Sequence, residues 1–347
     1  MLTNSNSLYL TIIKYQMLDT VLNFIKLIFS RKVIFISNTL QMLSSIEFIH
    51  AHKSFHNKFS NFIIICPYTN EETFKKIKLC HREFIKKKNL ILNYHTKIEI
   101  KILYIVLALK KFLNLKINQI IIGNYFSNLN QQFIKISREV FILDDGTNLL
   151  DKKHLKLIKK TRYLFFSFFD KKFFQKKFFT ENNFEFFKNK FNIKKKYSKK
   201  NILILGSPLV EGNYIKANQY DFVIEYIKKN FKNKNFYYFP HPKENTYRLQ
   251  KKFKFLKILK SSYPCEIFIL KLKNIPKKIV TFGSSSIISL KILNKNFNIC
   301  NLFLTNNLSK KNSAWNLYHN RQIKFKDYIL KFSVKSKEIE LQDNDDI

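Results

Sequence analysis

The chain has 347 residues, of which 46% are hydrophobic and 25% are charged, and its formal net charge is +39. This length predicts two domains, each large enough for its own core, and this composition excludes a disordered chain. Only six of the 63 basic residues are arginine, whereas proteins that bind nucleic acid use arginine for forked contacts with phosphate and guanine. The scarcity of arginine therefore disfavours nucleic acid as a partner. It leaves an anionic membrane surface, which lysine serves well, as an alternative.

The four cysteines are scattered, without Cys-x-x-Cys spacing and without clustered histidines. This pattern predicts neither a zinc site nor a disulfide framework, and it fits a reducing compartment. No apolar run reaches the roughly 20 residues that a spanning helix needs, and the first thirty residues lack the features of a signal peptide. We expect a cytoplasmic protein, with peripheral attachment to the inner face of the plasma membrane and a homodimer as open alternatives.

In residues 33–160, short apolar runs alternate with helical patterns. Such alternation predicts a parallel, doubly wound sheet. The first run is followed by Asn38 and Thr39, either of which can cap the next helix, and no G-x-G-x-x-G follows it. A dinucleotide-binding dehydrogenase is therefore disfavoured. The expected strands are 33–37, 62–66, 90–93, 119–123 and 140–143, and the expected helices are 39–56, 71–87, 97–115 and 129–136.

In residues 161–200, pairs of phenylalanine alternate with pairs of lysine, and no glycine or proline interrupts them. We favour an interdomain segment whose phenylalanines pack on both domains. The alternative is a basic aromatic surface at the level of lipid headgroups.

A second series of strands and helices occupies residues 201–335. The expected strands are 202–205, 236–239, 278–281 and 297–302, and the expected helices are 217–231, 264–272 and one that ends near residue 293. The chain is thus predicted to be an α/β protein of the GT-B type, in which two Rossmann-like domains face each other across a cleft. We expect an N-terminal extension at 1–32, domains at 33–160 and 201–335 joined by the 161–200 segment, and an acidic tail at 336–347.

Polar residues follow three of these strands directly. Asp144, Asp145, Gly146 and Thr147 follow the strand at 140–143, which delivers two carboxylates to the rim of a sheet. Taken alone, this sequence is also an ordinary turn followed by a helix cap.

The other two strand ends lie in the second series. His241 stands between two prolines, which fix the backbone around it. Gly283 and the serines Ser284, Ser285 and Ser286 open a helix and offer hydroxyls and backbone N–H groups to a phosphate. A carboxylate base, an imidazole and a phosphate cradle are the parts that metal-independent glycosyl transfer needs. Each part alone is more simply explained as a turn or a cap, so the ordered set carries the prediction.

The ordered set resembles the bacterial lipooligosaccharide sialyltransferases of glycosyltransferase family 52 and the related capsule polysialyltransferases. Asp144-Asp145-Gly146, His241-Pro242 and Ser284-Ser285 match their acidic-acidic-Gly, His-Pro and Ser-Ser motifs in order. Two further segments are similar: Asn38-Thr39-Leu40-Gln41, with Leu40 where a proline is usual, and residues 206–211, with Ser207 where a glutamine is usual. The resemblance extends from about residue 33 to residue 320.

The resemblance implies inverting transfer of sialic acid from CMP-sialic acid to a hydroxyl of a cell-surface glycan, lipooligosaccharide or capsule, with no cofactor and no metal. It implies Asp145 as general base, with Asp144 in support or in its place, and His241 as a ligand or acid for the donor phosphate. The implied donor-binding residues are Gly206, Ser207, Pro242, Lys243, Glu244, Gly283, Ser284, Ser285 and Ser286. The implied acceptor or cleft residues are Asn38, Thr39, Gln41, Gly146 and Thr147.

Two alternatives stay open from the sequence. The donor could be a related nonulosonic acid or another nucleotide sugar on the same GT-B fold. The protein could also be a non-catalytic basic module that binds a membrane or nucleic acid. The sequence Asp343-Asn344-Asp345 looks like a metal-binding Asp-x-Asp, but its place in an acidic terminus predicts a solvated tail.

Overall fold

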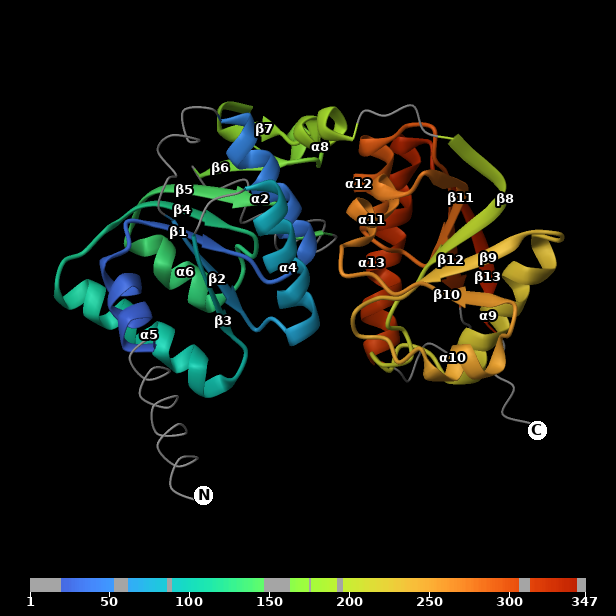
Figure 1. Ribbon diagram of the computed structural model, residues 1–347, viewed down its shortest axis with the longest axis horizontal. Helices are drawn as coiled ribbons and strands as arrows, with labels where there is room; N and C mark the ends of the chain where they lie inside the picture. Colours follow the sequence, from blue (N-terminus) through green and yellow to red (C-terminus); the bar gives the residue numbers. More distant parts are fainter. Residues whose placement is uncertain are drawn as a thin grey trace, which may run out of the picture. The chain divides into compact units, whose positions relative to one another are not determined.

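The computed structural model describes residues 20–52, 62–85, 89–146, 163–174, 176–191, 196–305 and 313–341. The chain forms two compact units, each built on its own β-sheet (Figure 1). The first unit comprises Met1–Asp144, Arg162–Ser167 and Lys176–Thr180, and the second comprises Asp145–Thr161, Phe168–Gln175 and Glu181–Ile347.

The sheet of the first unit has the strand order β3-β2-β1-β4-β5-β6-β7, and the pairings from β3 to β6 are parallel. Its helices pack in two pairs, α2 with α4 and α5 with α6. The strands are β1 (Lys32–Phe35), β2 (Ile63–Pro67), β3 (Leu90–Tyr94), β4 (Ile117–Ile122), β5 (Ser137–Leu143), β6 (Leu164–Ser167) and β7 (Phe179–Glu181). The helices are α2 (Thr39–Ala51), α4 (Glu71–Phe84), α5 (Lys97–Phe112) and α6 (Asn128–Lys135).

The sheet of the second unit is parallel throughout, with the order β10-β9-β8-β11-β12-β13. Its strands are β8 (Lys196–Leu205), β9 (Asn235–Phe239), β10 (Leu256–Ile258), β11 (Asn274–Thr281), β12 (Asn298–Thr305) and β13 (Lys335–Glu340). The helices are α8 (Glu185–Lys190), α9 (Ala217–Asn230), α10 (Tyr247–Lys252), α11 (Cys265–Lys271), α12 (Ser286–Leu293) and α13 (Ser313–Ile329). Its short 3-10 turns are η2 (Lys171–Phe173) and η4 (Leu330–Phe332), while η3 (Lys176–Phe178) belongs to the first unit.

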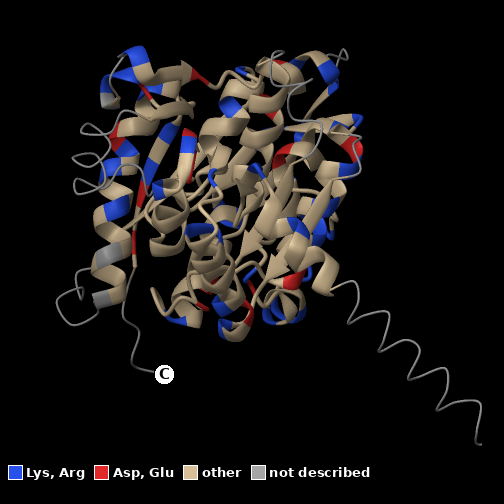
Figure 2. Ribbon diagram, turned by 90° about the vertical axis from the view of Figure 1, so that its left-hand side faces the viewer, with Lys and Arg blue, Asp and Glu red and all other residues tan. Residues whose placement is uncertain are grey.

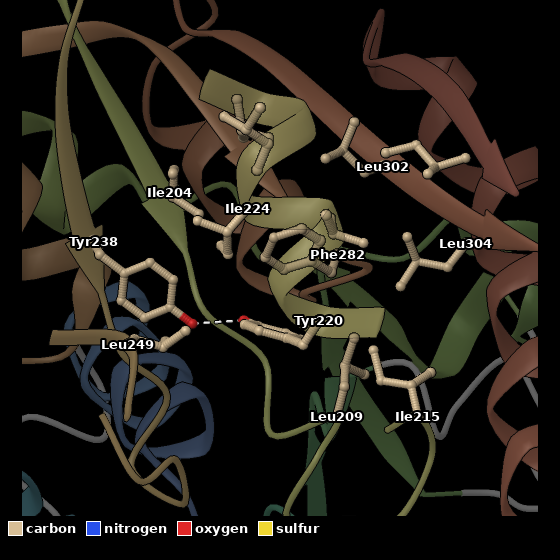
Figure 3. Close-up of a cluster of buried hydrophobic side chains, with 14 of the residues drawn as sticks. Ile204, Leu209, Ile215, Tyr220, Ile224, Tyr238, Leu249, Phe282, Leu302 and Leu304 are labelled. Atoms are coloured by element: carbon tan, nitrogen blue, oxygen red, sulfur yellow. Dashed lines mark hydrogen bonds between the residues drawn. The ribbon is translucent and has the colours of Figure 1, made fainter. Parts of the chain in front are cut away.

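The core of the second unit lies between its sheet and α9 and α13. Trp315 and Tyr318 of α13 are buried in this core. Ile224 of α9 and Leu302 of β12 lie in the same cluster (Figure 3). The hydroxyls of Tyr220 and Tyr238 meet within this apolar cluster at 2.6 Å. Burial of this apolar surface is the main favourable contribution to folding of the unit.

The prediction of two Rossmann-like domains of the GT-B type is confirmed. The residues between the two series are more structured than a linker. Phe165 and Phe166 lie in β6, which extends the first sheet beside β5, and both are buried. Five more phenylalanines of this segment are buried as well, which leaves them no role in a basic aromatic surface at a membrane: Phe168, Phe169, Phe174, Phe184 and Phe187.

The expected acidic tail from residue 336 is wrong over its first part. Lys335–Glu340 form β13, which pairs with β12 from Cys300 to Thr305, and Ile339 of β13 is buried. The sequence Asp343-Asn344-Asp345 lies outside the described residues.

In the view of Figure 2, the lysines and arginines among the described residues are spread along many elements. Within the part of the chain that the structure describes, no helix is both long enough and apolar enough to span a bilayer.

Candidate donor and base sites

The order of strands reverses between β8 and β11 in the middle of the second sheet. Leu205 and Thr281 are paired there, so the loops that begin at Gly206 and Phe282 leave the same edge of the sheet side by side. In open α/β sheets, ligands bind outside the carboxyl ends of the strands at such a reversal. Gly206 and Gly283 therefore flank the position at which open α/β sheets generally bind ligands.

Gly206 allows a carboxylate to approach the end of β8. A Cβ atom at this position would overlap the Glu244 carboxylate and the Tyr238 hydroxyl. The Gly206 N–H bonds to the Phe239 carbonyl of β9 at 2.9 Å, which closes the sheet at this point. Glycine is thus required because the space of a side chain is occupied.

The His241–Glu244 turn follows β9 and is held by hydrogen bonds within itself. The Glu244 N–H bonds to the His241 carbonyl at 2.9 Å, and the Lys243 N–H donates to His241 Nδ1 at 3.2 Å. Since Nδ1 accepts this bond, the proton of a neutral imidazole is on Nε2. His241 is exposed, so it can present an Nε2–H donor to a ligand.

The loop after β8 is tied to the same turn. Glu211 accepts a hydrogen bond from the Asn245 N–H at 2.8 Å. Within the loop, the Gly212 N–H bonds to the Pro208 carbonyl at 2.9 Å, while Ser207 and Pro208 are half-buried. The structure therefore brings the predicted residues Gly206 and Ser207 together with the His-Pro turn.

The segment from Gly283 to Ser286 connects β11 to α12. Gly283 has φ +76°, which favours glycine, and its N–H donates to Asn301 Oδ1 at 2.8 Å. The three serines are half-buried, and Ser285, the residue before α12, makes no side-chain cap. The Ser284 hydroxyl accepts a hydrogen bond from the Ser286 N–H at 3.3 Å. Helix starts that carry hydroxyls in this way are common binding places for a phosphate.

Two residues that the sequence did not suggest lie behind Gly283. Gln322 of α13 occupies the space where a Cβ of Gly283 would lie, and Asn301 belongs to β12. Both side chains are buried. Neither residue stands in a recognisable motif, and only the pairing of distant elements brings them to the helix start.

In the first unit, Asp144 follows β5 and is fully buried. The Ser167 hydroxyl, at the end of β6, donates a hydrogen bond to Asp144 Oδ1. Asp145 is 8% exposed, and Gly146 has φ +63°. Ser167 could have been found only by recognising β6 in the phenylalanine-rich segment. Thr147 lies outside the described residues.

The first sheet also reverses its order, between β1 and β4. Asn38 caps α2 by accepting a hydrogen bond from the Gln41 N–H at 2.9 Å, as expected for one of the two predicted caps. The Gln41 side chain is fully buried against Gly123 and accepts from the Ser37 N–H at 2.6 Å. The Gln41 side chain therefore connects the residues that follow β1 and β4 inside the unit. Asn38 and Thr39 are half-buried at the end of β1.

Among the described residues, no group of three or more His, Cys, Asp or Glu side chains is placed to hold a metal ion.

The fold is similar to that of solved structures whose sequences have diverged far from this one. The α/β-galactoside α-2,3-sialyltransferase of Photobacterium phosphoreum superposes with a TM-score of 0.50 at 14% identity, over 88% of this chain and 97% of that chain. The UDP-GlcNAc 2-epimerase of Methanocaldococcus jannaschii, solved with UDP-GlcNAc and UDP, gives 0.52 at 15% identity, over 78% and 83%. At such identities the likeness establishes the two-domain fold alone. No curated protein sequence matches the chain.

Residues 156–306 match the family model of glycosyltransferase family 52. The matched region contains Gly206, the His241–Glu244 turn and the Gly283–Ser286 segment. Together with the two-domain fold, this match supports a glycosyltransferase, which is the class of enzyme that the sequence predicts.

Proposed function

We propose that this protein is an inverting sialyltransferase, which transfers sialic acid from CMP-sialic acid to a hydroxyl of a cell-surface glycan such as lipooligosaccharide or capsule. The observation that carries the proposal is the strand reversal at β8 and β11, where Gly206, the His241 turn and the Gly283–Ser286 helix start leave one sheet edge. This edge lies within the region that matches glycosyltransferase family 52.

The donor phosphate is assigned to the second unit. The backbone N–H groups at the start of α12 and the hydroxyls of Ser284 and Ser285 would hold its oxygens. The His241 Nε2–H would donate to the same phosphate as the bond to the sugar breaks, which stabilises the negative charge on the departing CMP.

The general base is assigned to Asp145. It would take the proton of the acceptor hydroxyl while the new glycosidic bond forms and the bond to CMP breaks. Asp144 is fully buried and accepts a hydrogen bond from Ser167, so its carboxylate is less accessible than that of Asp145. We therefore assign Asp144 a supporting role.

The test is transfer from CMP-sialic acid to a galactose-terminated acceptor by the full chain. General acid–base groups contribute about 10²- to 10⁴-fold, so we expect losses of that size in Asp145→Asn and His241→Asn. Asp327→Asn, at an exposed position of α13, is the control and should transfer normally. Wild-type activity in both Asp145→Asn and His241→Asn would refute the assignment of Asp145 as general base and of His241 as donor to the phosphate.

A donor panel read by thermal shift tests the identity of the donor, because a ligand that binds the native state raises its melting temperature. We expect CMP-sialic acid to raise it most. A larger shift with another nonulosonic acid donor or with a UDP-sugar would replace the donor and keep the enzyme class. Binding to anionic vesicles or DNA without any nucleotide binding would favour a non-catalytic module instead.

A further inference from the structure

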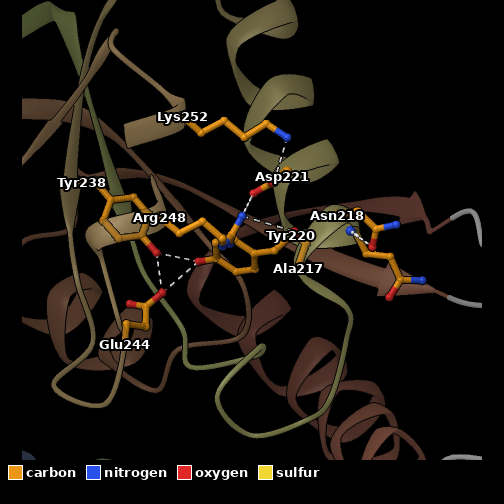
Figure 4. Close-up of polar contacts among 9 residues, drawn as sticks. Ala217, Asn218, Tyr220, Asp221, Tyr238, Glu244, Arg248 and Lys252 are labelled. Carbon is orange, nitrogen blue, oxygen red and sulfur yellow. Dashed lines mark hydrogen bonds and ion pairs between the residues drawn. The ribbon is translucent and has the colours of Figure 1, made fainter. Parts of the chain in front are cut away.

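The carboxylate of Glu244 is the meeting point of three hydrogen-bond donors from different parts of the second unit. The His241 N–H donates to Oε2 at 2.6 Å. Tyr238 of β9 and Tyr220 of α9 donate to Oε1 at 2.5 Å and 3.1 Å (Figure 4). A carboxylate only accepts, so its two oxygens can serve all three donors at once.

The phenols that face Glu244 are rigidly placed. Tyr220 is 2% exposed and Tyr238 is fully buried, and both belong to the hydrophobic core of the unit. Burial raises the pKa of both phenols, so they remain protonated donors. Through Glu244, these two core residues are connected to the backbone of an exposed loop.

The bond from the His241 N–H to Glu244 fixes the backbone of the residue whose imidazole is assigned to the donor phosphate. The same turn is closed at its other end by the Glu244 N–H and the His241 carbonyl, and the Lys243 N–H holds Nδ1. The turn therefore depends on the carboxylate for its attachment to the core, and the imidazole tautomer depends on the turn.

We propose that Glu244 is a positioning residue, which holds the His241 turn so that the Nε2–H of His241 points at the departing phosphate. The proposal rests on the proposed function of His241 and goes beyond a general donor-binding role for Glu244. In this assignment the Glu244 carboxylate bonds to the protein, and it acts on the reaction through His241.

Glu244→Leu tests the proposal, because it fills the site but accepts no hydrogen bond. Hydrogen bonds to charged groups contribute roughly 10- to 100-fold, so we expect kcat to fall by about that factor. Glu244→Gln should lose less, because its carbonyl oxygen can still accept the His241 N–H. In a His241→Ala background, adding Glu244→Leu should change kcat by less than about threefold, since residues that act as a unit are not additive.

Asp221→Asn is the matched control, because Asp221 is also a buried carboxylate of this cluster. Its carboxylate pairs with Arg248 and, at 2.9 Å, with Lys252 (Figure 4), whereas the Glu244 carboxylate bonds to the His241 N–H. A loss caused only by a weakened domain should appear in both variants and should add to the loss in His241→Ala. Additive losses for Glu244→Leu would overturn the proposal.

A second measurement does not depend on transfer. The ¹³C and ¹⁵N shifts of the His241 ring report its tautomer, and we expect the Nε2–H form to dominate in the wild type and to become mixed in Glu244→Leu. If Glu244→Leu does not fold, Glu244→Asp replaces it, because its shorter side chain moves the carboxylate oxygens away from the His241 N–H. The same two measurements, kcat and the His241 ring shifts, then test the proposal. An unchanged tautomer in a folded variant refutes the positioning role. Absence of transfer by the wild type, with the tautomer change present, refutes the proposed function alone.

Discussion

His81 makes the first unit sensitive to acid, and the size of the effect follows from its burial. The side chain lies on α4 and is 4% exposed, with its ring 6.3 Å from that of Phe62 in an edge-to-face arrangement. The Asn89 amide lies 3.4 Å from Nε2. Burial lowers the pKa of His81 from 6.5 to about 4, because the charged imidazolium would lose its hydration.

The sign follows from which state binds the proton. Below pH 6.5 the unfolded chain protonates this histidine, while the folded chain keeps it neutral until about pH 4. Stability is therefore lost as the pH falls from 6.5 to 4. At about 1.4 kcal/mol for each pH unit, the loss reaches about 3 kcal/mol near pH 4. His81→Gln removes the titration and keeps an acceptor for the Asn89 amide.

Hydrogen exchange of the α4 amides, measured between pH 7.5 and 4.5 and corrected for the intrinsic exchange rate, reports the stability of this unit directly. The single tryptophan, Trp315, lies in the second unit, so its fluorescence would report on the other domain. We expect the free energy of opening to fall with acid in the wild type and to fall about 3 kcal/mol less in His81→Gln. His95→Gln, at an exposed position, should follow the wild type. Parallel pH profiles for His81→Gln and the wild type would refute the reasoning, whatever their offset at pH 7.

Two glycine substitutions test the edge of the second sheet. Gly206→Ala places a methyl group against the Glu244 carboxylate, so we expect a loss of about 2 kcal/mol from disrupted hydrogen bonds, seen as a fall of roughly 4–8 °C in melting temperature, and a lower kcat. An unchanged melting temperature would show that Glu244 can move without cost. Gly283→Ala at φ +76° should cost about 1–2 kcal/mol, with an added clash against Gln322 that Gln322→Ala relieves. Equal losses with and without Gln322→Ala would contradict that contact.

The positions of the site residues could be predicted because strong local patterns define them. Apolar runs that end near Asp144, Gly206, His241 or Gly283 place these residues at strand ends. Because the strands of each sheet are parallel, the strand ends of one sheet lie at the same edge. Seven predicted helices and nine predicted strands appear at the expected places, with ends that differ by a few residues. Asn38 caps α2 because its short side chain accepts the Gln41 N–H.

Three of the elements that were not predicted, β6, β7 and β13, have weak local patterns. β6 and β7 lie in a segment so rich in phenylalanine and lysine that no periodicity distinguishes strand from linker. β13 is an edge strand with the sequence KSKEIE, in which Ile339 is the one buried residue. Charged residues on an edge strand discourage pairing with other chains, and they also make the strand read as a solvated tail. Its pairing with β12 is a long-range contact that local sequence does not encode.

Glu244 illustrates how a site residue can oppose the stability of its own domain. Burial raises the pKa of Glu244, and the carboxylate of Glu211 adds to the shift, despite the hydrogen bonds from Tyr238, Tyr220 and the His241 N–H that favour the charged form. A raised folded-state pKa means that Glu244 contributes most to stability below the ordinary pKa of a glutamate, and that this contribution is lost as the pH rises through the folded-state value. The ionised carboxylate therefore stabilises the folded unit less than the protonated carboxyl does. A neutral side chain of similar size would fill the same space without a buried charge, but it could not accept from all three donors. In the positioning role proposed for Glu244, the hydrogen bond to the His241 turn, rather than the stability of the core, is the reason for a carboxylate at this position.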